Sequence, residues 1–212
     1  MKRLLSALFI TLIFLISPFS IHASQGVIES DPFDIVIPNA ITSSVSLVII
    51  ESHRKLTTCT GVVIKNTPTE SIVLTAKHCL VFEGDIYVES FLVEYIGVSY
   101  KSDLAYLVLN RFIPYKTPVR ISNSIPKKDD RIFGIGYPNT KLYTTKGTMF
   151  VQTPKEQYAF IDIIKGCSGG GVFNTDGELI GIMVRHYSGI GLGILERLED
   201  IHTIINVNKL LE

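Results

Sequence analysis

Short runs of β-branched and aliphatic residues alternate with polar turn segments from Ser44 onward. Each run is about four to eight residues long, and this length and composition are typical of strands in an antiparallel sheet. Segments such as "ESHRKLT", "NTPTE" and "FEGD" separate the runs and favour turns. The first group of predicted strands covers residues 44–50, 60–65, 71–76, 91–98 and 104–109.

A second group of predicted strands follows a loop rich in proline, lysine and asparagine. Many short strands at regular spacing are typical of all-β sandwiches and barrels. Two groups of strands therefore predict two lobes packed together, and crevices between lobes are common places for sites. The second group covers residues 131–138, 148–153, 157–164, 170–173, 178–185 and 191–195.

The pattern changes in the last segment, residues 196–212. Its apolar positions recur at nearly helical spacing, which predicts a C-terminal helix. These positions are Leu198, Ile201, Ile204, Ile205 and Val207. The hydrophobic pattern as a whole predicts an all-β protein with one terminal helix.

The first residues have the pattern of an export signal. Lys2 and Arg3 give a positive start, Leu4–Ile16 is almost purely apolar, and small residues before Ser24 offer a cleavage site. The alternative is a membrane anchor, but the apolar run is shorter than the roughly 20 residues that a span needs. We therefore predict that residues 1–23 are a signal peptide, that no stable membrane insertion remains after its cleavage, and that the protein is secreted or periplasmic.

Residues 24–40 contain two prolines and several polar residues. This composition is typical of a mature N-terminal arm or a short pro-segment. The folded domain is then expected over residues 41–212, with its two lobes at about 41–120 and 121–212.

Charge and cysteine content exclude several classes of function. The chain has 20 basic and 20 acidic residues, and the absence of a clustered basic stretch predicts no nucleic-acid partner. An oxidising compartment permits one disulfide among Cys59, Cys79 and Cys167 and leaves one thiol. Neither Cys-x-x-Cys nor His-Glu-x-x-His occurs, so we expect no metal site and no cofactor.

The stretch "GCSGGGVF", Gly166–Phe173, places a serine among glycines. A serine hydroxyl is a weak nucleophile that needs a base, usually histidine, and a carboxylate that orients this base. It also needs backbone N–H groups directed at the oxyanion, and glycines let the backbone present them. The partners are His78, where the apolar strand of "VLTAKHCL" ends, and Asp103, at the start of the strand in "YKSDLAYLVL".

These segments resemble the motifs of trypsin-like (chymotrypsin-fold) serine proteases. "TAKHC" is similar to their Thr-Ala-Ala-His-Cys signature, "SDLAYL" to Asp-Ile-Ala-Leu-Leu, and "GCSGGGVF" to the Gly-Asp-Ser-Gly-Gly-Pro box. "CTGVVI" resembles the strand whose cysteine pairs with the one after the histidine. The resemblance covers about residues 44–212 and is greatest to compact bacterial HtrA-like and glutamyl-endopeptidase-like branches, here without the PDZ domain that often follows.

The resemblance implies two six-stranded antiparallel β-barrels with a C-terminal helix. It implies His78 as general base and later acid, Asp103 as the group orienting it, and Ser168 as the nucleophile. Gly166 and Ser168 would supply the oxyanion N–H groups, and Cys59–Cys79 would be the disulfide. The implied function is an exported serine endopeptidase that hydrolyses protein or peptide substrates through an acyl-enzyme.

Cys167 stands where the animal enzymes have an aspartate that pairs with a newly cut N-terminus. A cysteine does not form that ion pair, so we expect no activation by N-terminal insertion. Cys167 is interpreted as a small buried residue, with a redox-sensitive thiol or a thiol nucleophile as alternatives. A further alternative is a catalytically silent homologue that binds peptides.

Three residues are candidates for the substrate pocket. Asp162 lies six residues before Ser168, at the offset that selects basic side chains in trypsins. An outward-facing strand acid is the other interpretation of Asp162. Arg185 and His186, on the opposite wall, would instead favour an acidic substrate side chain, and a surface loop explains them equally well.

Overall fold

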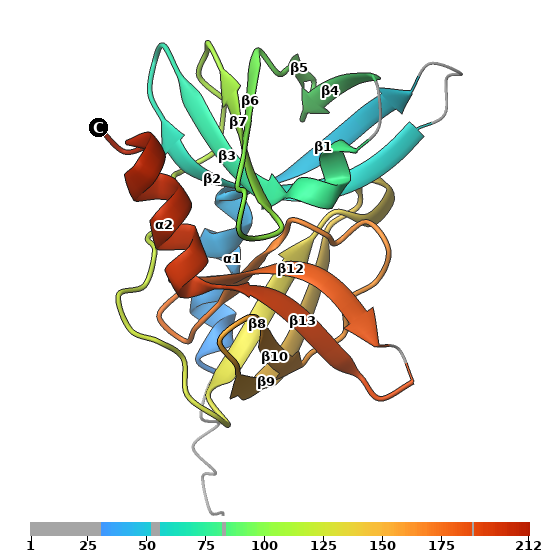
Figure 1. Cartoon of the computed structure of the whole chain (residues 1–212), viewed down its shortest axis with the longest axis vertical. Helices are drawn as coiled ribbons and strands as arrows, with labels where there is room; N and C mark the ends of the chain where they lie inside the picture. The colour runs from blue at the N-terminus through green and yellow to red at the C-terminus, as the bar shows by residue number, and fades with distance from the viewer. Residues whose placement is uncertain (1–30, 52–55, 82–83, 188) are drawn as a thin grey trace, which may run out of the picture. The chain divides into compact units, whose positions relative to one another are not determined.

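The computed structural model describes residues 31–51, 56–81, 84–187 and 189–212 of the chain (Figure 1). The predicted signal peptide and the first part of the predicted arm lie outside the described residues. Antiparallel strands dominate the described part, and they form two lobes. This confirms the all-β prediction.

The first lobe is a seven-stranded antiparallel sheet in the order β5-β4-β1-β2-β3-β7-β6. Its elements are β1 (Ser44–Glu51), β2 (Leu56–Asn66), β3 (Ser71–Ala76), the short 3-10 helix η1 (Lys77–Leu80), β4 (Gly84–Val88), β5 (Phe91–Leu92), β6 (Tyr95–Val98) and β7 (Leu104–Leu109). The implied six-stranded barrel differs from this sheet in strand number, and the described edge strands β5 and β6 do not pair.

Two local features cause the difference. The run expected over 91–98 divides at Val93 and Glu94 into β5 and β6, which pair with opposite ends of the sheet. Strand β4 was not predicted because its sequence, "GDIYV", begins with two residues that favour turns.

The second lobe is a closed barrel of six strands in the order β10-β13-β12-β11-β8-β9. This confirms that one lobe is a six-stranded antiparallel barrel. Its elements are β8 (Arg131–Gly136), the 3-10 turn η2 (Pro138–Thr140), β9 (Tyr143–Gln152), β10 (Gln157–Phe160), β11 (Gly171–Phe173), β12 (Leu179–Tyr187) and β13 (Leu192–Arg197).

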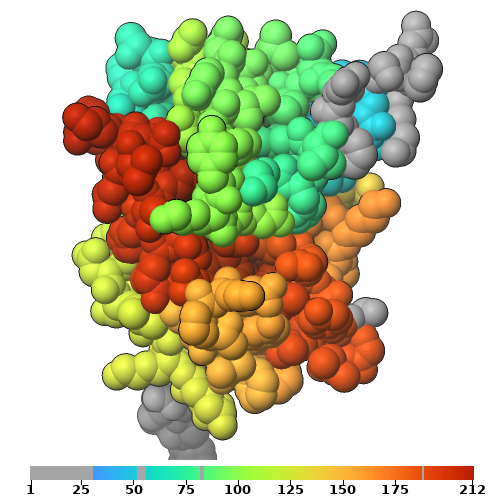
Figure 2. Space-filling model, in the orientation of Figure 1, coloured from blue at the N-terminus to red at the C-terminus, as the bar shows by residue number. Residues whose placement is uncertain are grey.

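A shared hydrophobic core joins the lobes. Val62, Leu74 and Tyr106 of the first sheet pack in one cluster with Phe133 and Phe173 of the barrel. The C-terminal helix α2 (Leu198–Asn208) was predicted, and it adds the side chains of Ile201, Ile204 and Ile205 to the same cluster. Val207, assigned to the apolar face from sequence, is instead 75% exposed. Figure 2 shows α2, in red, beside both the green first lobe and the orange second lobe.

Helix α1 (Phe33–Thr42) was not predicted, because its sequence contains Pro38 and follows Pro32. Phe33 is buried, and its ring meets the ring of Phe133 edge-on at 5.2 Å between centroids. The carboxylate of Asp31 binds Arg131 and Lys146 of the barrel. This end of the predicted arm is therefore packed on the second lobe. In the part of the chain that the structure describes, neither helix has the length and hydropathy to span a membrane.

Candidate active site

His78 and Asp103 are brought together at one end of the first sheet. Strands β3 and β7 pair in a register that sets Ala76 opposite Leu104, so the residues just beyond them are neighbours. The Nδ1 atom of His78 lies 2.6 Å from Oδ2 of Asp103, and the backbone N–H of His78 donates to Oδ1 at 2.8 Å. One carboxylate therefore holds both the ring and the backbone of the histidine.

The environment keeps Asp103 ionised. Burial raises the pKa of Asp103, but the hydrogen bonds from His78 and the positive charges of His78 and Lys77 outweigh this effect, and the net pKa lies below its ordinary value. Lys77 also fixes the loop before Asp103, because its Nζ donates to the carbonyls of Ser99 and Ser102 at 3.0 and 2.9 Å. An ionised carboxylate in this position accepts the Nδ1–H proton and leaves Nε2 of His78 free as a base.

The loop that carries Ser168 requires its glycines. Gly166 and Gly169 have φ angles of +99° and +83°, a backbone conformation that residues other than glycine rarely adopt. A Cβ atom at Gly169 would lie 2.2 Å from the carbonyl oxygen of Thr60, which sterics forbid. The serine loop is thus pressed against strand β2 of the other lobe.

The amide groups of this loop fall into two sets. The N–H groups of Cys167, Gly169 and Gly170 donate to the carbonyls of Ile164, Met183 and Cys167. Within the described residues, the N–H groups of Gly166 and Ser168 have no acceptor. These two amides are the pair that sequence analysis assigned to the oxyanion, and they are free to receive one.

The side chain of Ser168 is in a resting position. Its Oγ lies 3.4 Å from the carbonyl oxygen of Val184, a long hydrogen bond. Among the described residues, no hydrogen bond joins Ser168 Oγ to His78. The structure therefore brings two of the three predicted side chains into contact and places the third on the adjacent loop.

Thr60 is a site residue that sequence analysis missed. It is fully buried, and its backbone N–H donates to the carbonyl of Ser168 at 2.8 Å. Its Oγ1 donates to the carbonyl of Gly166 at 2.9 Å and accepts the N–H of Tyr137 at 2.8 Å. One residue of the first lobe therefore holds both ends of the serine loop. Its position directly after Cys59 was the one signal that pointed to the site.

The disulfide implied by the resemblance is confirmed: Cys59 and Cys79 are bonded. It ties strand β2 to η1, the turn that carries His78. The sulfur of Cys79 lies 3.7 Å from the carbonyl oxygen of Ser168. This is a packing contact, since a disulfide sulfur carries no hydrogen, and it shows that the histidine turn and the serine loop touch.

Cys167 is fully buried, as predicted. Burial raises the pKa of its thiol to about 11, and the charge of Asp162 adds to the rise against a hydrogen bond from Ile164. A thiol with so high a pKa is a poor nucleophile at neutral pH. This observation argues against a thiol enzyme.

A cavity of about 510 Å³ opens next to Ser168, and all three residues that were assigned to the substrate pocket line it. Asp162 is exposed, and its Oδ2 accepts a hydrogen bond from Tyr143 at 2.8 Å. His186 is mostly buried, with Nε2 at 3.8 Å from Oδ1 of Asp162 and no hydrogen-bond partner in the described chain. Arg185 directs its guanidinium to Glu156 at 3.1 Å.

A second hollow, of about 550 Å³, lies between the lobes beside Asp103. It agrees with the predicted crevice. The first lobe lines it with the loop before β7, and the second lobe with β12, β13 and the start of α2. Glu196 is part of this lining and accepts the backbone N–H of Asp103 at 2.9 Å. Sequence analysis missed Glu196 because it placed this residue at the start of the C-terminal helix, whereas the helix begins at Leu198 and Glu196 belongs to β13.

Two antiparallel β lobes, joined at a histidine–aspartate pair and a glycine-framed serine, define the class of trypsin-like serine proteases. Comparison with known families agrees: a trypsin-like peptidase domain matches residues 59–182, more than half of the chain, and the chain therefore belongs to this family.

Among solved structures, the chain is similar to the crystal structure of the serine endoprotease from Yersinia pestis, with a TM-score of 0.71 and 23% sequence identity. The match covers 82% of this chain and 65% of that chain, and it shows a shared fold. No curated protein sequence is significantly similar to the chain.

Proposed function

We propose that this protein is an exported serine endopeptidase that hydrolyses peptide bonds through an acyl-enzyme. The contact that carries the proposal is the 2.6 Å hydrogen bond between His78 Nδ1 and Asp103. It fixes the imidazole tautomer in which Nε2 is the base. The free amides of Gly166 and Ser168 supply the second requirement, a receptor for negative charge.

The reaction follows from these groups. Nε2 of His78 accepts the hydroxyl proton of Ser168 while Oγ attacks the carbonyl carbon of the substrate. The carbonyl oxygen becomes an oxyanion and accepts hydrogen bonds from the N–H groups of Gly166 and Ser168. His78 then gives its proton to the leaving amine, which breaks the peptide bond and leaves the acyl-enzyme. Water, activated by the same histidine, hydrolyses the acyl-enzyme and regenerates Ser168.

One rearrangement precedes this step. Ser168 Oγ must leave the carbonyl of Val184 and turn toward His78. Such a rotation between staggered rotamers exchanges one long hydrogen bond for a better one. Catalytic hydrogen bonds are often long before substrate binds and tighten in the complex.

The cavity beside Ser168 is proposed to receive the substrate side chain that precedes the cleaved bond. Asp162, Arg185 and His186 all line it, and the carboxylate of Asp162 lies 3.8 Å from Nε2 of His186. Substrates are therefore proteins or peptides whose side chain at this position is selected by the balance of these charges.

Export is proposed from the N-terminal sequence, with Lys2 and Arg3 before the apolar run. The disulfide between Cys59 and Cys79 supports it, because such bonds persist in oxidising compartments and are rare in the cytosol. Detection of the mature N-terminus of protein recovered outside the cytoplasm tests this part.

A fluorophosphonate probe tests the proposed chemistry directly, since it labels only an activated serine. The wild-type protein should be labelled and should cleave a mixed peptide library. Ser168→Ala should lose both properties, and His78→Ala should lose most of the labelling. The resting contact of Ser168 with Val184 favours one alternative, a silent homologue that binds peptides. Intact wild-type protein that takes up no probe and cleaves no peptide would establish that alternative.

A further inference from the structure

We propose that Glu196 is a positioning residue for catalysis, which holds the aspartate of the catalytic pair from the opposite lobe. This inference rests on the proposed function and extends it. Its basis is the 2.9 Å hydrogen bond from the backbone N–H of Asp103 to Oε1 of Glu196. Asp103 directly precedes strand β7 of the first sheet, whereas Glu196 belongs to strand β13 of the barrel.

All polar groups of Asp103 have hydrogen-bond partners, and of the partners among the described residues only Glu196 comes from the second lobe. Its carboxylate oxygens accept both N–H groups of His78, and its carbonyl accepts the backbone N–H of Lys77 at 2.9 Å. These bonds tie Asp103 to η1 but do not fix η1 and Asp103 relative to the serine loop. Glu196 supplies that link, because its strand belongs to the same barrel as the loop.

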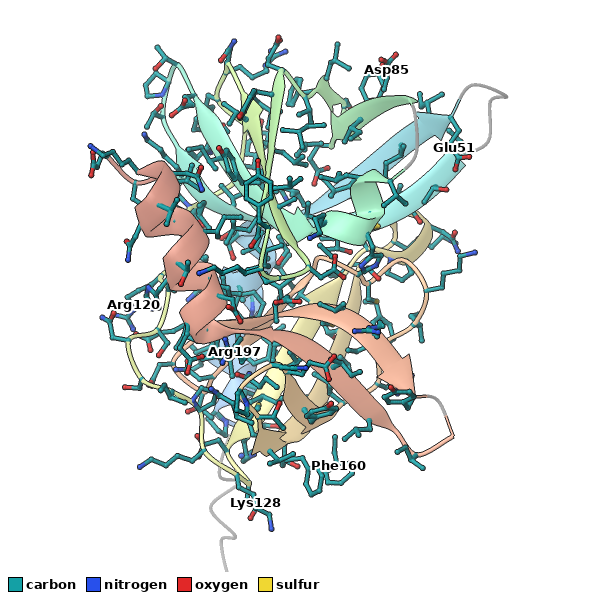
Figure 3. All side chains as sticks on the ribbon, in the orientation of Figure 1. Glu51, Asp85, Arg120, Lys128, Phe160 and Arg197 are labelled. Atoms are coloured by element: carbon teal, nitrogen blue, oxygen red, sulfur yellow. A yellow bond between two sulfur atoms is a disulfide. The ribbon has the colours of Figure 1, made fainter. Side chains whose placement is uncertain are left out.

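Strand β13 is a rigid support at this point. Glu196 pairs with Ile182 of β12, two residues before Val184, whose carbonyl contacts Ser168. The next residue, Arg197, is labelled at the start of α2 in Figure 3 and binds Asp200 with two hydrogen bonds of 2.7 and 3.1 Å. The pairing of β13 with β12 therefore fixes the backbone of Glu196 in the barrel.

The ionised form of Glu196 is energetically unfavourable at this position unless a specific hydrogen bond stabilises it. Burial raises the pKa of Glu196, and the negative charges of Asp200 and Asp103 raise it further, while the N–H of Asp103 and the charge of Arg197 lower it. A carboxylate placed beside another carboxylate is unfavourable unless it forms a specific bond. A charged acceptor makes its hydrogen bond roughly twice as strong as a neutral one, and this bond is the one to Asp103.

Substitutions separate the hydrogen bond from the charge. Glu196→Gln keeps the acceptor and loses the charge, so kcat should fall by no more than about threefold. Glu196→Asp keeps the charge but withdraws it by one methylene, and Glu196→Ala removes the acceptor. For both of these, kcat should fall about tenfold or more with little change in KM, because a small misplacement of a catalytic group has large effects on rate.

Two controls identify a merely structural effect. Asp200→Asn removes a negative charge from the same hollow and keeps an oxygen that can accept a hydrogen bond from Arg197, and among the described residues Asp200 has no hydrogen bond to Asp103. Ile204→Val weakens the core between the lobes, and its loss of thermal stability can be matched to that of Glu196→Ala. Both controls should retain wild-type kcat. A Glu196→Ala protein with wild-type kcat, or equal losses of kcat in Glu196→Ala and Ile204→Val, would overturn the inference.

A second readout does not depend on activity. In the Ser168→Ala background, hydrogen exchange of the Asp103 amide should be faster in Glu196→Ala and Glu196→Asp than in Asp200→Asn, because its acceptor is lost. Equal exchange rates in all three variants would show that Glu196 does not hold the Asp103 amide. If wild-type protein takes up no fluorophosphonate, the proposed function fails, and the exchange rates still decide whether Glu196 holds Asp103. If Glu196→Ala does not fold, the comparison of Glu196→Gln with Glu196→Asp decides alone.

Discussion

The hydroxyl of Thr60 donates a hydrogen bond of 2.9 Å to the carbonyl oxygen of Gly166. Thr60 lies in the first lobe and Gly166 in the second, so this bond connects the lobes at the serine loop. The peptide that follows Gly166 is held at both ends, since its N–H, that of Cys167, donates to Ile164. These two bonds fix the Gly166–Cys167 peptide, which lies directly between the two amides proposed for the oxyanion.

Thr60→Val should reduce catalysis with little change in shape. The substitution leaves the carbonyl of Gly166 and the N–H of Tyr137 buried without their shared partner, at a cost of about 1–3 kcal/mol for an unsatisfied group. We expect the serine loop to shift from its position and kcat to fall about tenfold or more, because a small misplacement of catalytic groups has large effects on rate. Thr60→Ser keeps the hydroxyl and should remain within a few-fold of wild type. Equal kcat in the two variants would contradict this role.

The disulfide should stabilise the fold by about 3 kcal/mol, because it closes a loop of 20 residues in the unfolded chain. Urea unfolding of a Cys59→Ser, Cys79→Ser double variant measures the loss. A reductant should lower the midpoint of the wild-type protein and leave that of the double variant unchanged. A wild-type midpoint that is insensitive to complete reduction would argue against the estimate.

The thiol of Cys167 should be unreactive in the folded protein. With a pKa of about 11, roughly one molecule in a thousand carries a thiolate at pH 8, and the sulfur is buried. Iodoacetamide should therefore leave activity intact, whereas denatured protein with its disulfide closed should react at one thiol. Rapid alkylation of native protein with loss of activity would instead favour the thiol enzyme.

Asp31 should stabilise the attachment of α1 in a pH-dependent manner. Its hydrogen bond with Lys146, the N–H of Phe33 and the nearby basic charges lower its pKa from 3.8 to about 2. Because the folded-state pKa lies below that of the unfolded chain, this stabilisation is present above about pH 4 and is lost as the pH falls toward 2. The Tm difference between wild type and Asp31→Asn should narrow across this window. A Tm difference that stays constant from about pH 5 to about pH 2 would contradict this role of Asp31.

Asp162→Asn should change substrate preference in a defined direction. Asp162 is the acid that lines the cavity beside Ser168, and its removal leaves Lys165 and Arg185 as the charged lining residues, with Arg185 paired to Glu156. The ratio of kcat/KM for basic over acidic side chains before the cleaved bond should fall. A peptide library with paired Lys and Glu substrates measures this ratio. An unchanged ratio would indicate that Asp162, which follows the end of β10 at Phe160, is an exposed acid without a role in selection.

Sequence analysis predicted neither helix α1 nor the open first sheet, and the physical reasons can be identified. Prolines before and within residues 33–42 weaken the helix signal, and the helix is stabilised by the burial of Phe33 against Phe133. Contacts of this kind join residues far apart in the chain, and local propensity contains no information about them. The same holds for strand β4, whose short sequence becomes a strand by pairing with β1.

Most strands and the three candidate catalytic residues, by contrast, could be predicted from the sequence. The alternation of apolar runs and turns predicted most strands, because each strand needs a short run of β-branched residues wherever it pairs. The segments around His78, Asp103 and Ser168 predicted the candidate site, because a nucleophile, a base and an orienting acid must each follow or begin a buried strand. What only tertiary structure decided is how these parts are held: Thr60 against Gly166, and Glu196 against Asp103. A threonine in a strand and a glutamate before a helix have ordinary sequence contexts, and packing of the two lobes alone brings them to their partners.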